Sequence, residues 1–366
     1  MNILQIVSSS RTSGAEKHVA VLSEQLIRRG HQVTALCPPG DWLPGQLRAT
    51  GVPVIEKSMH GLRFCPALWE VTRWAREHRV DLIHAHLTCA AYHGFFSGLL
   101  SRLPVVASVH VLTHDLVYRC LLPMGRHRII TVSDFVRQAL LRQGIPASQV
   151  QTIYNGTEFS PDVVATTVEA LPVRAELSLP PDAELVGIFA RVDEFKGHPL
   201  LVRAARRVVQ ARPRTYFVCV GPVQPQMQHR LWQIAAADGV AERLRFTGTR
   251  NDVSRLMAAM DVITLPSQYE MCSMSIIEAM MLGKPVVATR AGGNPELIQD
   301  GVTGLLIERD PQVLAEALIT LLSNPARRER MGRAAHARAQ AKFSAGVMAD
   351  QVEALYREML AARAVR

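Results

Sequence analysis

The sequence predicts an α/β protein with two doubly wound domains, each built on a parallel sheet. Short, nearly continuous apolar runs alternate with segments of helical periodicity, which is typical of parallel strands covered on both faces. This pattern occurs twice and fades in between, from about residue 155 to residue 182. The length of 366 residues and the 48% share of hydrophobic residues suit two packed domains.

The first domain is predicted to span residues 1–165. Its first strand is expected at 2–7, followed by a helix over about 14–29 and a strand at 31–37. Further strands are expected at 81–86, 104–110, 127–133 and 150–154, with helix-like segments between them. The order of strand and helix is that of a doubly wound sheet.

A linker is predicted at 166–182, because this stretch and the residues before it are rich in turn formers, among them Pro161, Pro172, Pro180 and Pro181. The second domain is then expected over 183–343, with a helix at 198–210. Its strands are predicted at 184–190, 215–221, 244–249, 261–267, 285–290 and 303–308. The segment 344–366 is helical with no strand after it, and we expect it to cross back onto the first domain.

Composition excludes several classes of protein. No apolar run reaches the ~20 residues of a membrane-spanning helix, and no secretory signal opens the sequence. The six cysteines form no C-x-x-C pair, which argues against a disulfide scaffold or structural zinc and fits a reducing compartment. We therefore expect a cytoplasmic protein.

The formal net charge of +9 is spread along the chain. It indicates either a solvated surface or attraction to anionic membranes and phosphorylated substrates. No basic and aromatic recognition module is present, so nucleic acid is not an expected partner. Two basic segments, 67–79 and 116–128, also carry large apolar side chains. Each either packs on the sheet or makes peripheral contact with an anionic membrane.

Ligands of doubly wound sheets bind beyond the carboxyl ends of the strands, where the strand order reverses. Two such domains place a site in a cleft between facing edges. In the second domain, Glu270 follows the strand at 261–267, and Glu278 lies seven positions further in a helix that begins near Ser273. The N-terminus of that helix suits a diphosphate, and Glu278 on its inward face suits a ribose diol. As the alternative, Glu278 is an ordinary helix-surface residue.

These motifs resemble those of the retaining GT-B glycosyltransferases of family 4. The resemblance is carried by Ser13-Gly14-Ala15-Glu16, the segment ending at His110, the segment Arg191 to Gly197, and the Glu270-x7-Glu278 motif. It covers nearly the whole chain. It implies the GT-B fold and transfer of a sugar from a nucleotide-diphosphate sugar to an acceptor hydroxyl with retained anomeric configuration. It also implies that no cofactor or metal is needed, and the sequence has no Asp-x-Asp motif.

The resemblance also implies roles for individual residues. In the catalytic set, Arg191 and Lys196 hold the diphosphate, Glu270 orients the sugar, and His110 lies near the reacting sugar. The implied donor-binding residues are Arg191, Lys196, Glu270, Ser273, Met274, Ser275, Glu278 and Arg250. The resemblance implies that Ser13 and Gly14 bind the acceptor, and His86, near the carboxyl end of its strand, is a further candidate for acceptor binding.

Some residues keep a second interpretation or depart from the family. His84 and His86 point to the same side of one strand, where core packing is as good an explanation as acceptor binding, and the sequence offers no third ligand for a metal. Arg250 either stacks on the nucleotide base or is solvent-exposed.

The chain departs from the family in two places. Where relatives commonly have Gly-Phe-Gly, this chain has Met271, Cys272 and Ser273. We expect the Cys272 side chain to be packed in the protein interior, and a positive φ at Met271 would be strained. Ser13 stands where relatives often have glycine.

Three other functions remain as alternatives. A nucleotide-sugar epimerase or hydrolase would use the same architecture without an acceptor. A non-catalytic scaffold would have kept the fold alone, although the intact set of charged residues argues against this. A dinucleotide oxidoreductase lacks its signature here, because no G-x-G-x-x-G opens either domain. The resemblance favours bacterial surface polysaccharide or glycolipid assembly, with a saccharide, lipid-linked or small-molecule acceptor.

Overall fold

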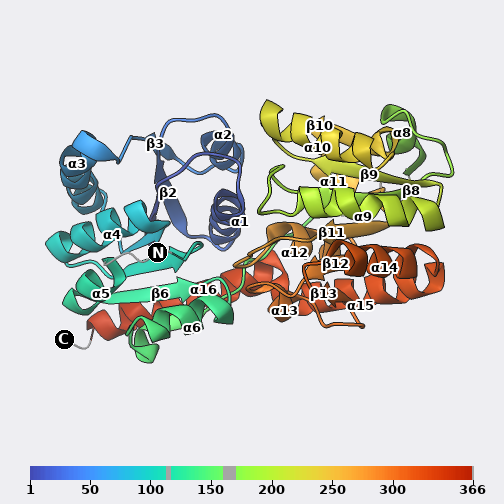
Figure 1. The fold of residues 1–366 in the computed structure, drawn as a ribbon. Coiled ribbons are helices and arrows are strands. Elements are labelled where there is room, and N and C mark those ends of the chain that lie inside the picture. The colour runs from blue at the N-terminus through green and yellow to red at the C-terminus, as the bar shows by residue number, and fades with distance from the viewer. Residues whose placement is uncertain (113–116, 160–169, 365–366) are drawn as a thin grey trace. The chain divides into compact units, whose positions relative to one another are not determined.

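The computed structural model describes residues 1–112, 117–159 and 170–364, and the chain divides into two compact units. The first unit consists of residues 1–156 together with 342–366, and the second of residues 157–341 (Figure 1). Residues 113–116, 160–169 and 365–366 lie outside the described part. Leu116, Pro161 and part of the predicted linker fall among them.

The first unit contains a seven-stranded parallel sheet within its described residues, in the order β3-β2-β1-β4-β5-β6-β7. The strands are β1 (Asn2–Val7), β2 (Gln32–Cys37), β3 (Val54–Glu56), β4 (Leu82–His86), β5 (Val105–Val109), β6 (His127–Thr131) and β7 (Val150–Thr152). The α-helices are α1 (Gly14–Arg28), α2 (Trp42–Ala49), α3 (Phe64–Glu77), α4 (Thr88–Ser101), α5 (Val117–Leu121), α6 (Asp134–Arg142) and α16 (Ala345–Ala364). Short 3-10 turns occur at Gly61–Arg63, Leu122–Met124 and Ala147–Gln149.

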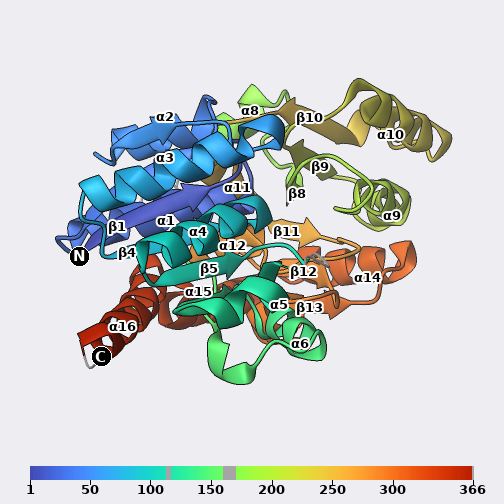
Figure 2. The same ribbon diagram turned by 90° about the vertical axis from the view of Figure 1, so that its left-hand side faces the viewer.

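The helix α16 completes the first unit from the far end of the chain. It packs against α1, and α3 packs against α4 (Figure 2). Met348, Val352 and Tyr356 of α16 share one apolar cluster with buried side chains of α1, β1 and β2. Arg29 at the end of α1 also contacts Asp350 at 2.5 Å and Glu353 at 3.2 Å. The first 156 residues therefore depend on the last helix to cover one face of their sheet.

The second unit contains a six-stranded parallel sheet within its described residues, in the order β10-β9-β8-β11-β12-β13. The strands are β8 (Glu184–Phe189), β9 (Thr215–Val220), β10 (Leu244–Gly248), β11 (Val262–Leu265), β12 (Val286–Thr289) and β13 (Gly304–Ile307). The α-helices are α8 (Ala170–Glu176), α9 (His198–Ala211), α10 (Pro225–Ala237), α11 (Val253–Ala258), α12 (Met274–Met281), α13 (Asn294–Leu297), α14 (Pro311–Leu322) and α15 (Pro325–Phe343). A 3-10 turn lies at Ala241–Arg243.

The predicted fold class is confirmed, since both sheets are parallel and have helices between their strands. The strand order reverses between β1 and β4 in the first unit, and between β8 and β11 in the second. Within the described residues, no helix has the length and apolar character needed to span a membrane.

Two local predictions differ from the structure. The stretch predicted as a linker contains the helix α8, which belongs to the second unit. Pro172 lies in the first turn of that helix, where proline costs no hydrogen bond. The short strand β3 was not predicted, because its three residues are too few and too exposed to show a pattern.

Candidate functional site

The two loops that flank the reversal of strand order in the second unit meet through an ion pair. Lys196 follows β8 and Glu270 follows β11, and the lysine Nζ lies 2.7 Å from the Glu270 Oε1. The carboxyl ends of neighbouring parallel strands share one edge, which brings together residues 74 positions apart. The structure thus joins two residues that the sequence assigned to one site.

The Glu270 carboxylate is 7% exposed and is held from several sides. The Ser267 hydroxyl donates to the same Oε1 at 2.7 Å, and the Gly293 N–H donates to the Glu270 carbonyl at 2.9 Å. Gly292 has a φ of +54°, and a Cβ at this position would lie 1.8 Å from the Glu270 carbonyl oxygen. Only glycine allows the loop after β12 to approach the Glu270 loop this closely. Glu270 is therefore fixed in place by backbone packing.

Arg191 is the exposed member of the predicted cation pair. Its side chain is 69% exposed, and its Nε donates to the Asp193 Oδ2 at 2.7 Å. The Asp193 Oδ1 accepts from the backbone N–H of Lys196 at 2.7 Å. Asp193, which the sequence analysis did not assign, thus ties both predicted cations to one turn.

The helix α12 begins where the sequence predicted, and its N-terminal residues are engaged in the structure. Ser273 is the N-cap and accepts from the Ile276 N–H at 3.4 Å. The Ser275 hydroxyl donates to the Phe189 carbonyl at 2.6 Å, which ties the helix to the end of β8. Met274 is buried beside them. The Ser275 hydroxyl therefore bonds within the protein, at a residue that was predicted to bind the sugar donor.

Glu278 is buried in α12 among apolar neighbours, so it is not the exposed helix-surface residue of the alternative interpretation. Cys272 is buried, as expected for a packing residue. Met271 is not among the described residues with positive φ, so the strain considered for it does not arise.

Arg250 forms an ion-pair network, which neither of its two sequence interpretations included. Its guanidinium contacts Asp252 at 2.8 Å and Glu176 of α8 at 2.6 Å, and Arg255 contacts the same two carboxylates. The hydrogen bond from Arg250 and burial act in opposite directions on Asp252, and the net effect lowers its pKa. The hydrogen bond from Arg255 is the main cause of the lowered pKa of Glu176.

In the first unit, the predicted acceptor residues lie on two neighbouring loops. Ser13 is the extended N-cap of α1, and its hydroxyl donates to the buried carboxylate of Glu16. Gly14 is exposed at the start of the same helix. A carboxylate in the first turn stabilises the helix end, so Glu16 strengthens this turn.

His86 and His110 lie at the carboxyl ends of β4 and β5. The His86 Nδ1 is 3.3 Å from the His110 Nε2, and the His86 Nε2 is 3.1 Å from the Gln5 Oε1. His84 is fully occupied elsewhere, since its ring nitrogens contact the Tyr356 hydroxyl at 2.5 Å and the Ser108 hydroxyl at 2.8 Å. Burial lowers the pKa of all three histidines well below the usual value. They are neutral at pH 7.

His18 of α1 is a member of this cluster that the sequence analysis missed. Its ring centroid lies 4.9 Å from that of His110 and 5.6 Å from that of His86. Burial lowers the pKa of His18 to about 4, opposed by a hydrogen bond with the Asn155 side chain. The spacing of His18, Leu22 and Leu26 at intervals of four residues predicts that His18 is buried, but not that it reaches His110.

Leu87 follows His86 directly and has a φ of +72°. A non-glycine residue with positive φ is strained, and such strain gathers at functional sites. The turn that carries His86 is thus held in an unusual conformation.

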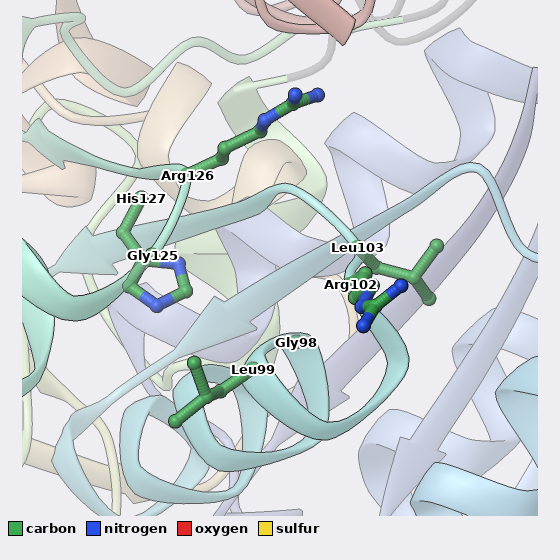
Figure 3. Close-up of a pocket in the computed structure, with 7 residues that line it drawn as sticks. All are labelled: Gly98, Leu99, Arg102, Leu103, Gly125, Arg126 and His127. Carbon is green, nitrogen blue, oxygen red and sulfur yellow. The ribbon is translucent and has the colours of Figure 1, made fainter. Parts of the chain in front are cut away.

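A separate cavity of about 410 Å³ lies at the opposite, amino edge of the first sheet (Figure 3). It is lined by the end of α4 and by residues 125–127, and it includes Arg102 and Arg126. Neither arginine has an acidic partner within the described part of the chain. None of the predicted site residues lines this cavity.

Known proteins resemble this chain over both of its units. Residues 12–160 match the family model of Glycosyltransferase Family 4, and residues 183–324 match that of glycosyl transferases group 1. The D-inositol 3-phosphate glycosyltransferase of Corynebacterium efficiens is 29% identical over 76% of this chain and 71% of its own length. The phosphatidyl-myo-inositol mannosyltransferase of Mycobacterium tuberculosis is 28% identical over 94% of this chain and 92% of its own length.

Solved structures extend the likeness to the whole fold. The crystal structure of Anabaena HepE in complex with UDP and glucose has 25% identity and a TM-score of 0.83, covering 97% of this chain and 99% of that chain. The chain has the two-sheet fold, the Lys196–Glu270 pair and the matched models on both units. It belongs to the GT-B glycosyltransferases of family 4.

Proposed function

We propose that this glycosyltransferase uses a nucleotide-diphosphate sugar and transfers the sugar to an acceptor hydroxyl with retention of anomeric configuration and without a metal. The observation that carries the proposal is the Lys196–Glu270 pair at the point where the strand order of the second sheet reverses. This is the place where such sheets bind nucleotides. The UDP and UDP-glucose complexes of HepE, a relative at 25–26% identity, support this donor class.

The donor chemistry needs cations and amides rather than a nucleophile. When the bond between the anomeric carbon and the diphosphate oxygen breaks, negative charge builds on the leaving diphosphate. Lys196 and the exposed Arg191 are fixed cations beside the same turn, and the N-terminus of α12 adds backbone N–H groups and partial positive charge. Glu270 orients the sugar, and Glu278 accepts hydrogen bonds from the ribose.

The acceptor binds to the first unit, near Ser13, Gly14, His86 and His110. The acceptor oxygen attacks the anomeric carbon from the face that the diphosphate leaves, and the departing phosphate oxygen takes the acceptor proton. No side-chain base is then required. His110 is neutral and 8% exposed, so it contributes a hydrogen bond to the reacting sugar rather than a charge.

A ligand screen tests the donor proposal directly. Thermal shift and calorimetry with UDP, GDP and ADP, with and without magnesium, should show one nucleoside diphosphate raising the melting temperature, because a ligand that binds only the folded state stabilises it. The shift should disappear in Lys196→Ala and should not need magnesium. A shift that appears only with magnesium would remove the metal-independent proposal.

A hydrolase would release free sugar, whereas a glycosyltransferase transfers the sugar to an acceptor. If the donor is consumed and only free sugar appears in the presence of every acceptor offered, the chain is a hydrolase. Transfer of the sugar to an acceptor excludes it.

We further propose peripheral contact with anionic membranes and a role in bacterial surface polysaccharide or glycolipid assembly. The first unit exposes Trp69 of α3, Leu100 of α4 and Met124. Arg102 and Arg126 line the cavity of Figure 3, and their charges would attract the phosphate of an anionic lipid. Two relatives act on inositol phosphate or phosphatidylinositol by name, which supports a phosphorylated or lipid acceptor.

Flotation with vesicles tests the membrane proposal. The chain should float with phosphatidylglycerol vesicles at low salt, and less so with Arg102→Gln combined with Arg126→Gln. Equal recovery with neutral and anionic vesicles would refute it, as would no binding to either.

A further inference from the structure

Three imidazole rings converge in the first unit from different elements of the fold. His18 comes from α1, His86 from the end of β4, and His110 from the residue after β5. One ring nitrogen of each lies within 4.8 Å of the others. The sequence offered no third ligand beside the histidines of β4, and the structure supplies it through His18.

The separations suit a small tetrahedral ion. A zinc ion bonds imidazole nitrogen at about 2.0–2.1 Å, so two nitrogens in its tetrahedral shell are about 3.4 Å apart. The His86 Nδ1 and the His110 Nε2 are already 3.3 Å apart. His18 would need to move inward by at most about 1.5 Å, which a side-chain adjustment provides.

The surroundings distinguish ligands from non-ligands. The second nitrogen of His86 contacts the Gln5 Oε1 at 3.1 Å, as metal-binding histidines usually contact an oxygen that orients the ring. His84 is only 4.1 Å from His86 between ring centroids, but both of its nitrogens are used by Tyr356 and Ser108. His84 is thus excluded as a metal ligand, and His18, His86 and His110 remain.

The exposure of the three rings indicates how an ion would reach them. His18 and His86 are fully buried, whereas His110 is slightly exposed, so the ion would enter past His110.

We propose that His18, His86 and His110 form a binding site for a divalent transition-metal ion, with zinc or cobalt as fitting ions and a fourth position left to water. Imidazole ligands suit these ions rather than magnesium or calcium. The ion has no role in the proposed transfer mechanism, although two of its ligands, His86 and His110, belong to the proposed acceptor site. Because the ion would use nitrogens of His86 and His110, it would compete with sugar binding there and inhibit transfer.

Cobalt titration of the EDTA-treated full chain tests the site without an activity assay. We expect a stoichiometry of one and the intense visible absorption of four-coordinate cobalt, which zinc then removes. His18→Asn should abolish this absorption while circular dichroism and thermal melting show a folded chain. His78→Asn, on the exposed end of α3, should leave it unchanged and controls for surface histidines.

A second variant keeps the test decisive if His18→Asn does not fold. Gln5→Met removes only the oxygen that orients His86, and we expect cobalt affinity to fall about 10- to 100-fold. Weak six-coordinate absorption in the wild-type chain would overturn the proposal. Unchanged cobalt binding in folded His18→Asn, or in Gln5→Met, would overturn it as well.

Discussion

Lys196→Met separates the catalytic and structural parts of the Lys196–Glu270 pair. The substitution keeps the aliphatic chain but removes the Nζ, which lies 2.7 Å from a carboxylate that is 7% exposed. Glu270 then retains the hydroxyl of Ser267 on the same oxygen. A hydrogen bond to a charged group contributes about 1.5–3 kcal/mol, so unfolding of the second unit should become easier by that amount.

The loss can be measured as a shift in melting temperature. One kcal/mol corresponds to about 2–4 °C in a unit of this size, which gives a decrease of about 3–12 °C. If Lys196 also stabilises the leaving diphosphate, kcat should fall about 10²- to 10³-fold, as it does when one preorganised donor is removed. Differential scanning calorimetry and a product assay at saturating donor give the two quantities.

A double variant and a matched control assign each effect. Glu270→Gln in the Lys196→Met background removes the unpaired charge, so it should recover stability but not turnover. Arg191→Met should lower kcat with a stability change within about 0.5 kcal/mol, because Arg191 is largely exposed. Unchanged kcat in Lys196→Met, measured with a folded protein, would show that the pair is only structural.

Three further predictions follow from single contacts. Gly292→Ala should reduce both activity and melting temperature, because its Cβ would lie 1.8 Å from the Glu270 carbonyl oxygen. Gly301→Ala is the control: Gly301 also has a positive φ but lies in open space, so this substitution should lower the melting temperature alone. Because the folded-state pKa of His18 is about 4 against 6.5 unfolded, stability is present above pH 6.5 and is lost as the pH falls toward 4. For this one group, the free energy of unfolding at pH 5 should be about 2 kcal/mol lower than at pH 7.5. Urea denaturation measures this difference, and a free energy of unfolding that stays constant between pH 7.5 and pH 5 would contradict the prediction. Ser275→Ala should cost about 1 kcal/mol through its lost bond to the Phe189 carbonyl. If the hydroxyl is used only in this bond, nucleotide affinity stays unchanged, whereas a large loss of affinity would support the predicted role of Ser275 in donor binding.

The sequence was sufficient for the fold class, because apolar runs specify buried parallel strands. The resemblance to family 4 also assigned Lys196 and Glu270 to one site, but their ion pair was not predicted. The hydroxyl of Ser275 illustrates the limit. Its bond to the Phe189 carbonyl depends on the distance between α12 and β8, and no local pattern contains that distance.

The ion-pair network of Arg250 and the position of His18 were not predicted, for related reasons. Glu176, a partner of Arg250, lies in α8, and the prolines around that helix suggested a linker instead. His18 lies in α1 and His110 follows β5, and only the packing of α1 brings the two rings together. In both cases the missing information was a contact between elements distant in the sequence.

The position of α16 has a consequence for the order of events during synthesis. The ribosome releases residues 1–156 well before residues 342–366, yet Met348, Val352 and Tyr356 belong to the apolar cluster of the first unit. Until the end of the chain emerges, that face of the sheet lacks its cover and His84 lacks the Tyr356 hydroxyl. The second unit, which is continuous in sequence, can fold in the meantime. The strands that precede the second unit in the chain are thus completed only after that unit, and their apolar face stays uncovered until α16 has been made.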